Sequence, residues 1–230
     1  MEKLVYLLGD SEPGSVPRAR IDLRERLLGA APALLAAGAR RASFTVADLD
    51  YPQADGVAQF NAHGLTDAKI ALWLDSLDER RAVEAVIAPL AERFAGYLVT
   101  ESVPRARASA GRAGGARSPG VCLVTTFDKP ASLDDEAFYE RWHGSHTPLS
   151  LEIHPLTLYV RNSVVRALTP GAPPLRAIVN EAVASVAIAA DAEKFYSGDE
   201  GRERAIKDLL SFVDFRSLST ALMSEYVLSA

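Results

Sequence analysis

Side chains that can transfer protons are concentrated in one stretch of the sequence, residues 132–162. This stretch holds three of the chain's four histidines, together with a tryptophan and two tyrosines. Imidazole is the side chain whose ordinary pKa lies nearest to neutral pH, so it often serves as a general acid or base. The residue types therefore predict acid–base chemistry that uses one or more of His143, His146 and His154.

A helix over residues 133–147 is predicted to position the first two of these histidines. Ser132 and Asp135 form a capping-box pattern at its start, and acidic residues fill the first turn, where the helix dipole favours negative charge. Pro148 has no amide hydrogen and disfavours helix in the residue before it. The helix is therefore predicted to end at Pro148, with His146 in its last turn.

One face of this helix carries rings at a four-residue spacing. Phe138, Trp142 and His146 recur every four residues, and Tyr139 lies beside them. Such a face can hold an aromatic substrate against the imidazole. Aromatic residues at helical spacing also pack into protein cores, which is the competing interpretation of Phe138 and Trp142.

A metal site is a second interpretation of the same helix. Glu140 and His143 have the Glu-x-x-His spacing of carboxylate-bridged helical metal sites. Such sites take further ligands from other helices, and the sequence offers none in an obvious position. No metal site is therefore predicted, and His143 and His154 are expected to be solvent-exposed.

Composition restricts the class of protein. The chain has 230 residues, of which 48% are hydrophobic and 24% charged, as in soluble globular proteins. It has no apolar run of about 20 residues and no signal-peptide pattern, so a cytoplasmic location is expected. The single cysteine, Cys122, is predicted to be a buried small hydrophobe. The net charge of −5 argues against nucleic acid or an anionic membrane as a partner.

The first half of the chain predicts the order strand, helix, strand, strand, helix, strand. Apolar or alternating patterns place strands at 3–8, 42–47, 69–74 and 97–103. A helix is predicted over 20–28, ended or kinked by Pro32, and a second helix follows the capping residue Ser76. Residues 51–67 are polar and are predicted to be a loop. Residues 1–103 thus form one predicted unit.

Residues 104–120 differ from the rest in composition. They contain four arginines and no acidic residue, and they are otherwise mostly Ala, Gly, Ser and Pro. Such a segment has too little apolar surface to order itself, so it is predicted to be a flexible basic linker.

The second half, residues 121–230, repeats the element order of the first. Strands are predicted at 121–127, 156–167, 183–189 and 220–228, with helices at 133–147 and 202–213. Two βαββαβ units in series predict an α+β fold made of two ferredoxin-like units. Each sheet has one face without helices, so the two units are expected to pack sheet to sheet as an α+β barrel within one chain.

The helix and the strand after it resemble a family motif. The frame Phe138-x3-Trp142-x3-His146-x-Pro148-Leu149, with Tyr159 and Asn162 in the next strand, resembles the signature of EthD-domain proteins in the dimeric α+β barrel superfamily. The resemblance implies a cavity between helix and sheet. The superfamily includes polyketide cyclases, lactone isomerases, cofactor-free monooxygenases and haem enzymes, so fold alone does not decide function.

The resemblance implies a cofactor-independent enzyme of the cyclase, dehydratase or isomerase type. His146 would be the general acid/base with Tyr159 as its hydroxyl partner, acting on a small aromatic or polyketide-like substrate. The alternatives are a haem protein and a non-catalytic, small-molecule-binding or stress-associated barrel protein. Residues expected to contact the substrate are Phe138, Tyr139, Trp142 and Asn162.

The two halves differ at the motif. If Pro32 is aligned with Pro148, Ala30 stands where His146 does, and Arg26 stands where Trp142 does. One site per chain is therefore predicted, built by the second half. Because both units lie in one chain, a monomer or a loose homodimer is expected.

Overall fold

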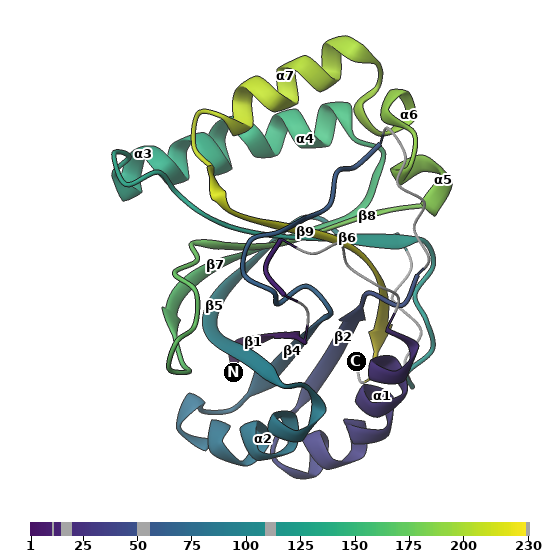
Figure 1. Ribbon diagram of the computed structural model, residues 1–230, viewed down its shortest axis with the longest axis vertical. Helices are drawn as coiled ribbons and strands as arrows, with labels where there is room; N and C mark the ends of the chain where they lie inside the picture. The colour runs from purple at the N-terminus through teal and green to yellow at the C-terminus, as the bar shows by residue number, and fades with distance from the viewer. Residues whose placement is uncertain (11, 15–19, 50–55, 109–113, 229–230) are drawn as a thin grey trace.

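The computed structural model describes residues 1–10, 12–14, 20–49, 56–108 and 114–228, and this part of the chain is organised around a closed antiparallel barrel (Figure 1). The strands are β1 (Glu2–Gly9), β2 (Arg41–Val46), β3 (Phe60–Asn61), β4 (Ala68–Leu74), β5 (Arg93–Arg105), β6 (Val121–Asp128), β7 (Leu156–Ala167), β8 (Ala177–Val183) and β9 (Asp214–Val227).

Hydrogen bonding between strands closes the barrel. The order is β2-β4-β1-β5-β7-β8-β6-β9, and β9 pairs with β2 to complete the ring, while β3 adds to the side of β9. In the first half, β1 lies between β4 and β5, and β2 follows on the other side of β4. In the second half, β6 lies between β8 and β9, and β7 follows on the other side of β8. Pairing of β5 with β7 and of β9 with β2 joins the halves. The predicted intrachain α+β barrel is therefore confirmed.

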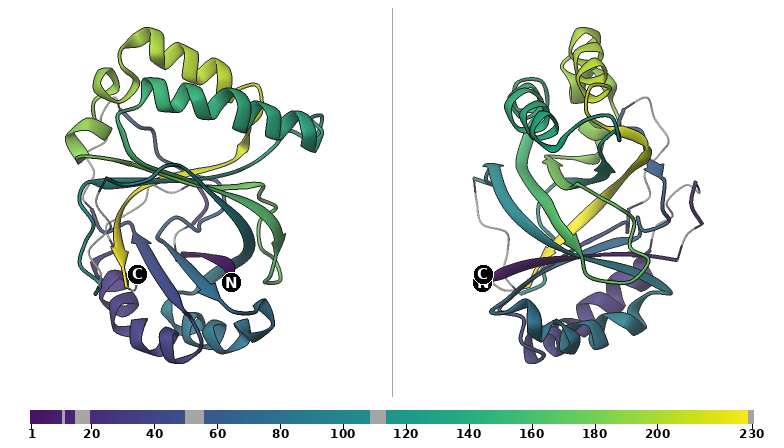
Figure 2. Two further views of the ribbon diagram at one scale, coloured as in Figure 1. Left: turned by 180° about the vertical axis from the view of Figure 1, so that it is seen from behind. Right: turned by 90° about the vertical axis from the view of Figure 1, so that its left-hand side faces the viewer.

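Helices cover the barrel on two opposite sides (Figures 1 and 2). The helices α1 and α2 lie on the first half, and α3, α4 and α7 lie on the second. The helical elements are α1 (Ile21–Ala36), η1 (Leu77–Glu79), α2 (Arg80–Ile87), η2 (Ala88–Leu90), α3 (Asp135–Tyr139), η3 (Glu140–His146), α4 (Thr147–Ile153), α5 (Val186–Ala189), α6 (Ala192–Tyr196) and α7 (Asp199–Leu209). No helix in the described part is long and apolar enough to cross a membrane.

Most strands are buried on both faces, which explains their continuous apolar runs. In β1, Leu4, Tyr6 and Leu8 pack in the core under α1 and α2. The alternate residues Val5 and Leu7 belong to a separate cluster inside the barrel. A third core, under the helices of the second half, contains the aromatic residues of the motif.

The helix α1 runs to Ala36 with Pro32 inside it, so the prediction of a helix that ends at residue 28 is wrong. Leu27, Ala31 and Leu34 are buried on one side of the helix, and their packing on the sheet outweighs the loss of one helical hydrogen bond.

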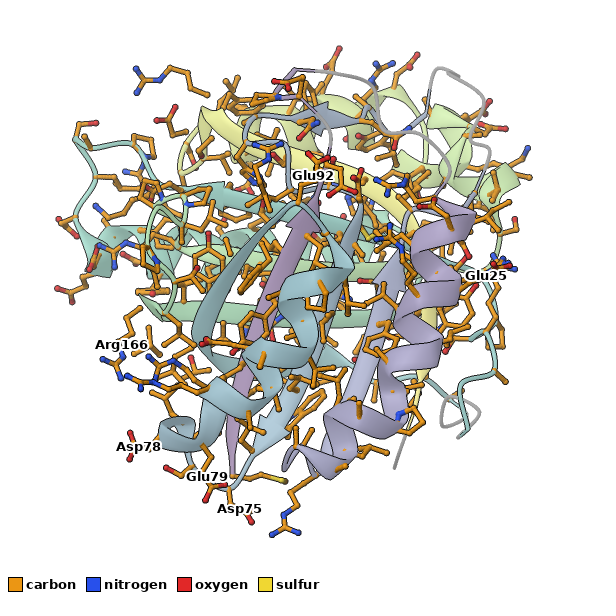
Figure 3. The ribbon with its side chains drawn as sticks, turned by 60° about the horizontal axis from the view of Figure 1, so that its bottom comes forward. Glu25, Asp75, Asp78, Glu79, Glu92 and Arg166 are labelled. Atoms are coloured by element: carbon orange, nitrogen blue, oxygen red, sulfur yellow. The ribbon has the colours of Figure 1, made fainter. Side chains whose placement is uncertain are left out.

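The second helix of the first half begins as its sequence predicts. The Ser76 hydroxyl accepts a hydrogen bond from the amide of Asp78 at 3.2 Å. Figure 3 shows Asp75, Asp78 and Glu79 together at this end of the molecule, where they are exposed. Acidic side chains are favoured there because the first turn of a helix carries partial positive charge.

The helix of the motif continues through Pro148 to Ile153, so the predicted end at Pro148 is wrong. The segment η3 has π-helical hydrogen bonding, in which the Thr147 amide bonds to the carbonyl of Trp142. This wider turn leads directly into Pro148, which occupies the first turn of α4, where a helix needs no amide donor. His146 therefore lies in the middle of a continuous helix. The negative end of the helix dipole is not beside it.

The strand predicted at 183–189 is displaced in the structure. The strand β8 covers Ala177–Val183, and residues 186–189 form the short helix α5, capped by Ser185. Asn180 and Glu181 interrupt the apolar pattern of β8, so the sequence does not predict a strand there.

In the predicted linker, residues 104–105 extend β5, while Arg107 and residues 115–118 contact β9. Arg107 forms a salt bridge with Glu225 at 2.6 Å. The amides of Gly115 and Ser118 donate to carbonyl groups of β9 at 2.9 and 2.7 Å. Residues 109–113 lie outside the described residues, as do residues 51–55 of the predicted loop at 51–67. The remainder of that loop contains β3.

Candidate functional site

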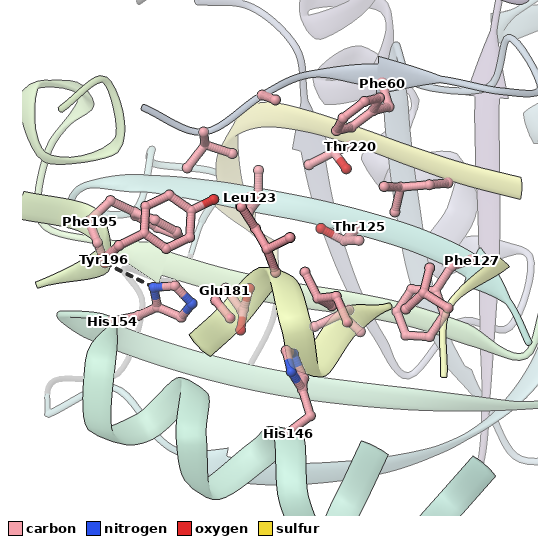
Figure 4. Close-up of a pocket in the computed structure, with 18 of the residues that line it drawn as sticks. Phe60, Leu123, Thr125, Phe127, His146, His154, Glu181, Phe195, Tyr196 and Thr220 are labelled. Carbon is pink, nitrogen blue, oxygen red and sulfur yellow. Dashed lines mark hydrogen bonds between the residues drawn. The ribbon is translucent and has the colours of Figure 1, made fainter. Parts of the chain in front are cut away.

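A cavity of about 320 Å³ lies between the sheet and the helices of the second half (Figure 4). The strands β6, β7, β8 and β9 form its floor, while η3, α6 and α7 form its roof. Residues 56–60 of the first half close one side. The wall is mostly apolar, and its polar members are Thr125, His146, His154, Tyr159, Glu181, Tyr196, Arg202 and Thr220.

His146 is held at this cavity by an acidic residue of another helix. Its Nδ1–H donates to Oδ2 of Asp208, on α7, at 2.8 Å. The Ser145 hydroxyl donates to the other oxygen of Asp208 at 2.9 Å. Burial alone would raise the pKa of Asp208, but the hydrogen bonds from His146 and Ser145 hold it below its usual value. An ionised Asp208 fixes both the orientation and the tautomer of His146.

The other ring nitrogen of His146 lies close to the Ser150 hydroxyl. The Nε2 atom is 3.2 Å from Oγ of Ser150, one helical turn further along. Because Nδ1 carries the hydrogen, Nε2 accepts from Ser150. The order Asp208, His146, Ser150 is that of a nucleophilic triad. However, Ser150 is buried and is not among the described residues that line the cavity, so its hydroxyl is not presented to a ligand.

Tyr159 lies near His146 but is linked to it indirectly. Its hydroxyl is 3.5 Å from Oγ1 of Thr147 and interacts with Ser150. Burial raises the pKa of Tyr159, so the phenol stays protonated and available as a donor. His146 and Tyr159, the predicted partners, are therefore linked indirectly in this structure, through hydrogen bonds to the Ser150 hydroxyl.

Glu181 is a cavity residue that the sequence reasoning missed. It lies directly opposite Tyr159 on the neighbouring strand, and Figure 4 shows its side chain between those of His146 and His154. Its Oε1 is buried with no hydrogen-bond partner among the described residues. Burial raises the pKa of this carboxyl group, although the nearby His146 opposes the shift. A carboxyl group of this kind is suited to hold or deliver a proton.

His154 is buried, so the expectation that it would be solvated is wrong. It is 8% exposed and lines the cavity, and its Nδ1–H donates to the carbonyl of Phe195 at 2.8 Å. Burial lowers its pKa to about 4, in spite of the hydrogen bond to that carbonyl. The neutral imidazole is therefore the form that the folded protein holds near neutral pH.

This burial predicts a loss of stability in acid. The unfolded chain protonates His154 near pH 6.5, whereas the folded chain resists protonation until about pH 4. Stability is therefore complete above pH 6.5 and falls as the pH drops through this window. At about 1.4 kcal/mol per pKa unit, His154 accounts for a loss of about 3 kcal/mol. Urea unfolding at pH 7 and pH 4 should show a smaller loss in His154→Gln than in the wild type. An equal loss in both would contradict the prediction.

The predicted substrate-binding residues separate into two groups. Trp142 lines the cavity beside His146. Phe138, Tyr139 and Asn162 are not among the described residues that do so. Phe138 is fully buried between the rings of Phe127, Trp142 and Phe212.

Asn162 and Tyr139 lie elsewhere. The side chain of Asn162 points to the barrel side of β7, where it donates to the carbonyl of Ile178 at 2.8 Å. The ring of Tyr139 packs on Phe138 and His143 at the edge of the core. Tyr159 and Asn162 thus face opposite sides of the sheet, as strand alternation requires.

His143 is half-buried, so the expectation that it would be exposed is only partly met. Its ring lies 4.6 Å from that of Trp142, and burial lowers its pKa to about 4. No group of three His, Cys, Asp or Glu side chains with metal-binding geometry occurs among the described residues.

The haem alternative requires a histidine such as His146 to bind the iron. An axial histidine needs one free ring nitrogen for the iron. Both ring nitrogens of His146 are engaged, by Asp208 and Ser150. Ligation of an iron by Nε2 would require the contact with Ser150 to break, and proton abstraction by the same nitrogen has the same requirement.

The position of Asp208 depends on the close packing of α7. A Cβ on Gly201 would lie 1.9 Å from the carbonyl oxygen of Tyr196, a backbone atom that cannot move independently. Gly201→Ala is therefore expected to lower the free energy of unfolding by about 1–3 kcal/mol and to loosen the Asp208–His146 contact.

Gly144→Ala is the matched control, because nothing lies within 4 Å of its Cβ. It should leave stability unchanged or raise it slightly. Thermal unfolding of the two variants measures the difference. Equal melting temperatures would show that the contact between position 201 and the Tyr196 carbonyl group is not rigid.

No family model and no curated protein matches this sequence. Solved structures do match. An anthrone oxidase-like protein matches 99% of this chain and 91% of its own, with a TM-score of 0.59 and 13% identity. The chain therefore shares its overall fold, a closed antiparallel barrel covered by helices, with that protein. In this fold the cavity described above lies between the helices and the sheet of one half.

Two further structures have lower similarity. A putative chlorite dismutase matches 100% of this chain and 96% of its own, with a TM-score of 0.46 and 11% identity. A mutant chlorite dismutase from Candidatus Nitrospira defluvii matches 97% of this chain and 91% of its own, with a TM-score of 0.47 and 12% identity.

Proposed function

We propose that this protein is a cofactor-independent acid–base enzyme that acts on a small aromatic or polyketide-like ketone, in a cyclase, dehydratase or isomerase type of reaction. The observation that carries the proposal is His146, placed at the wall of a mostly apolar cavity and oriented by the carboxylate of Asp208 at 2.8 Å. Each of these reaction types begins with removal of a proton from carbon beside a carbonyl group, which is the task of a general base.

The proposed reaction uses two groups of the cavity. The Nε2 atom of His146 takes the proton from the substrate carbon, and the electron pair moves onto the carbonyl oxygen as an enolate. Glu181, with its raised pKa, donates a hydrogen bond to that oxygen. Ser150, which donates to Nε2 in the free protein, turns away when the substrate approaches.

The size and chemistry of the cavity support an aromatic substrate. A volume of about 320 Å³ is at the lower end for small-molecule sites. Rings of Trp142, Phe127 and Phe195 are part of its wall. The similarity to an anthrone oxidase-like protein suggests anthrone as a probe, because its methylene group is activated by two aromatic rings and a ketone.

Proton exchange tests this proposal without knowledge of the final product. Anthrone is incubated with the protein in heavy water, and NMR follows exchange of its methylene hydrogens for deuterium. The protein should accelerate exchange above the buffer rate, and anthraquinone, which has no methylene group, should inhibit by competition. Saturable binding of anthrone without accelerated exchange would reject the enzymatic proposal.

That second result would favour the alternative, a non-catalytic small-molecule-binding or stress-associated barrel protein. One observation supports the alternative: both ring nitrogens of His146 are engaged within the protein. A histidine used only for packing would keep these two hydrogen bonds when a ligand is bound.

The remaining features of the proposal concern ancestry and partners. The strand order of each half supports two tandem ferredoxin-like units, and the cavity beside His146 supports an EthD-type motif. A small molecule is the proposed partner. A monomer or a weak homodimer in the cytoplasm, without nucleic acid or membrane, stays a prediction.

A further inference from the structure

The interior of the barrel contains a second pocket, separate from the cavity at His146. It has a volume of about 400 Å³ and is lined from both halves of the chain. Trp73 belongs to the cluster inside the barrel, and Lys3 and Lys69 lie two residues along their strands from Val5 and Ala71 of the same cluster, on the same face. None of its described lining residues belongs to the first cavity.

Positive charge exceeds negative charge in this pocket. Four cationic side chains line it together with two carboxylates. Lys3 pairs with Glu101, and Arg107 pairs with Glu225 at 2.6 Å. Within each pair the two charges cancel, which leaves the positive charges of Lys69 and Arg41. This local excess is opposite in sign to the net charge of −5 of the whole chain.

Lys69 is the deepest of these cations. It is 3% exposed, and its Nζ donates to Oδ1 of Asn180 across the barrel at 2.8 Å. An ammonium group has three donors, and among the described residues no carboxylate pairs with this one. Burial lowers the pKa of Lys69, although the nearby Cys122, Glu225 and Glu101 oppose the shift.

A neighbouring hydroxyl group also lacks a partner. Thr45 lies directly opposite Lys69 on the adjacent strand and is 1% exposed. Its Oγ1 has no hydrogen-bond partner among the described residues. Thr45 is not among the described residues that line the pocket, so Lys69 is the donor of this pair that the pocket presents to a ligand.

The mouth and the walls indicate what kind of acceptor fits. Arg41 stands at the exposed end of the pocket, with its guanidinium 4.1 Å from the centre of the Trp73 ring. The wall also includes the apolar side chains of Leu158 and Val160, on β7. The pocket thus combines a cationic floor, an apolar wall and a cationic entrance.

We propose that the barrel pocket binds a small monocarboxylate with an apolar body, whose carboxylate accepts a hydrogen bond from the Nζ group of Lys69. Arg41 attracts the anion to the entrance, and the apolar body lies along Leu158 and Val160. This site does not depend on the function proposed for His146.

Calorimetric titration of the full chain with hexanoate tests this site, with hexanamide as the neutral probe of the same shape. Hexanoate should bind at least ten-fold more tightly than hexanamide. Lys69→Met should weaken hexanoate binding at least ten-fold. The control Arg40→Met should change it less than two-fold, because the Arg40 side chain is exposed and pairs with Asp75 outside the barrel. Equal affinity for acid and amide, or unchanged binding in Lys69→Met, would overturn the proposal.

Two further measurements cover the risk of misfolding and of confusion with the first cavity. If Lys69→Met does not fold, Arg41→Gln at the exposed mouth should weaken binding several-fold, and unchanged binding would count against the proposal. The chain has two tryptophans, Trp73 in the barrel pocket and Trp142 in the first cavity. In Trp142→Phe, hexanoate should still change the fluorescence of Trp73. In Trp73→Phe, a response from Trp142 instead would place the acid in the first cavity and overturn the assignment.

Discussion

His146→Asn is expected to reduce protein-catalysed proton exchange at anthrone by about 10²–10⁴-fold, the usual contribution of a general acid or base. Asparagine keeps a donor for Asp208, which accepts from Nδ1 of His146 at 2.8 Å, so the helix contact survives. It provides no nitrogen that can accept a proton from carbon. Exchange rates from NMR in heavy water, at saturating anthrone, measure the effect.

His143→Asn is the matched control for this loss. It lies on the same helical segment, and its ring packs on Trp142 but is not among the described cavity-lining residues. Exchange should therefore stay within a few-fold of the wild-type rate. If both variants lost activity equally, the helix rather than the His146 imidazole would be responsible, and the assignment of His146 as the base would be wrong.

Phe138→Ala is expected to lower the free energy of unfolding by about 3–5 kcal/mol. The ring of Phe138 is fully buried and lies 5.6–6.3 Å from the rings of Trp142, Phe212 and Phe127, measured between ring centroids. Its removal leaves a cavity in the core that the surrounding rings cannot fill without leaving their edge-to-face contacts. Urea unfolding followed by circular dichroism measures the change.

Phe60→Ala distinguishes a packing role from a ligand-binding role. Phe60 is 43% exposed and lines the cavity on the first-half side. Its truncation should weaken binding of anthrone and change stability by less than about 1 kcal/mol. The opposite pattern, a stable Phe138→Ala variant with weak anthrone binding, would restore Phe138 as a substrate contact.

Local patterns in the sequence determined a large part of the fold. The strand predicted at 156–167 has these bounds in the structure, because its alternation of apolar and polar residues is a local property. The repeated element order predicted the barrel. Phe138 lies in the core, although the spacing of its ring also predicted a substrate-binding face. An aromatic helical face can have either role, and only the neighbouring elements decide between them.

Errors occurred where contacts with distant residues outweigh local preference. The continuation of α1 through Pro32 depends on burial of Leu34 against the sheet. The strand β8 was misplaced because Asn180 and Glu181 are polar residues in a strand, each facing a pocket. Functional positions often break the local pattern in this way.

The sequence by itself determined the α+β class, the barrel within one chain and the presence of His146 in an aromatic helix. Only the tertiary structure decided which groups act on that histidine. Asp208 is 62 positions away and reaches His146 through the packing of α7 against η3. Glu181 reaches the same cavity through the pairing of β8 with β7. Residue spacing predicts contacts within one element, whereas contacts between elements depend on how the whole core packs.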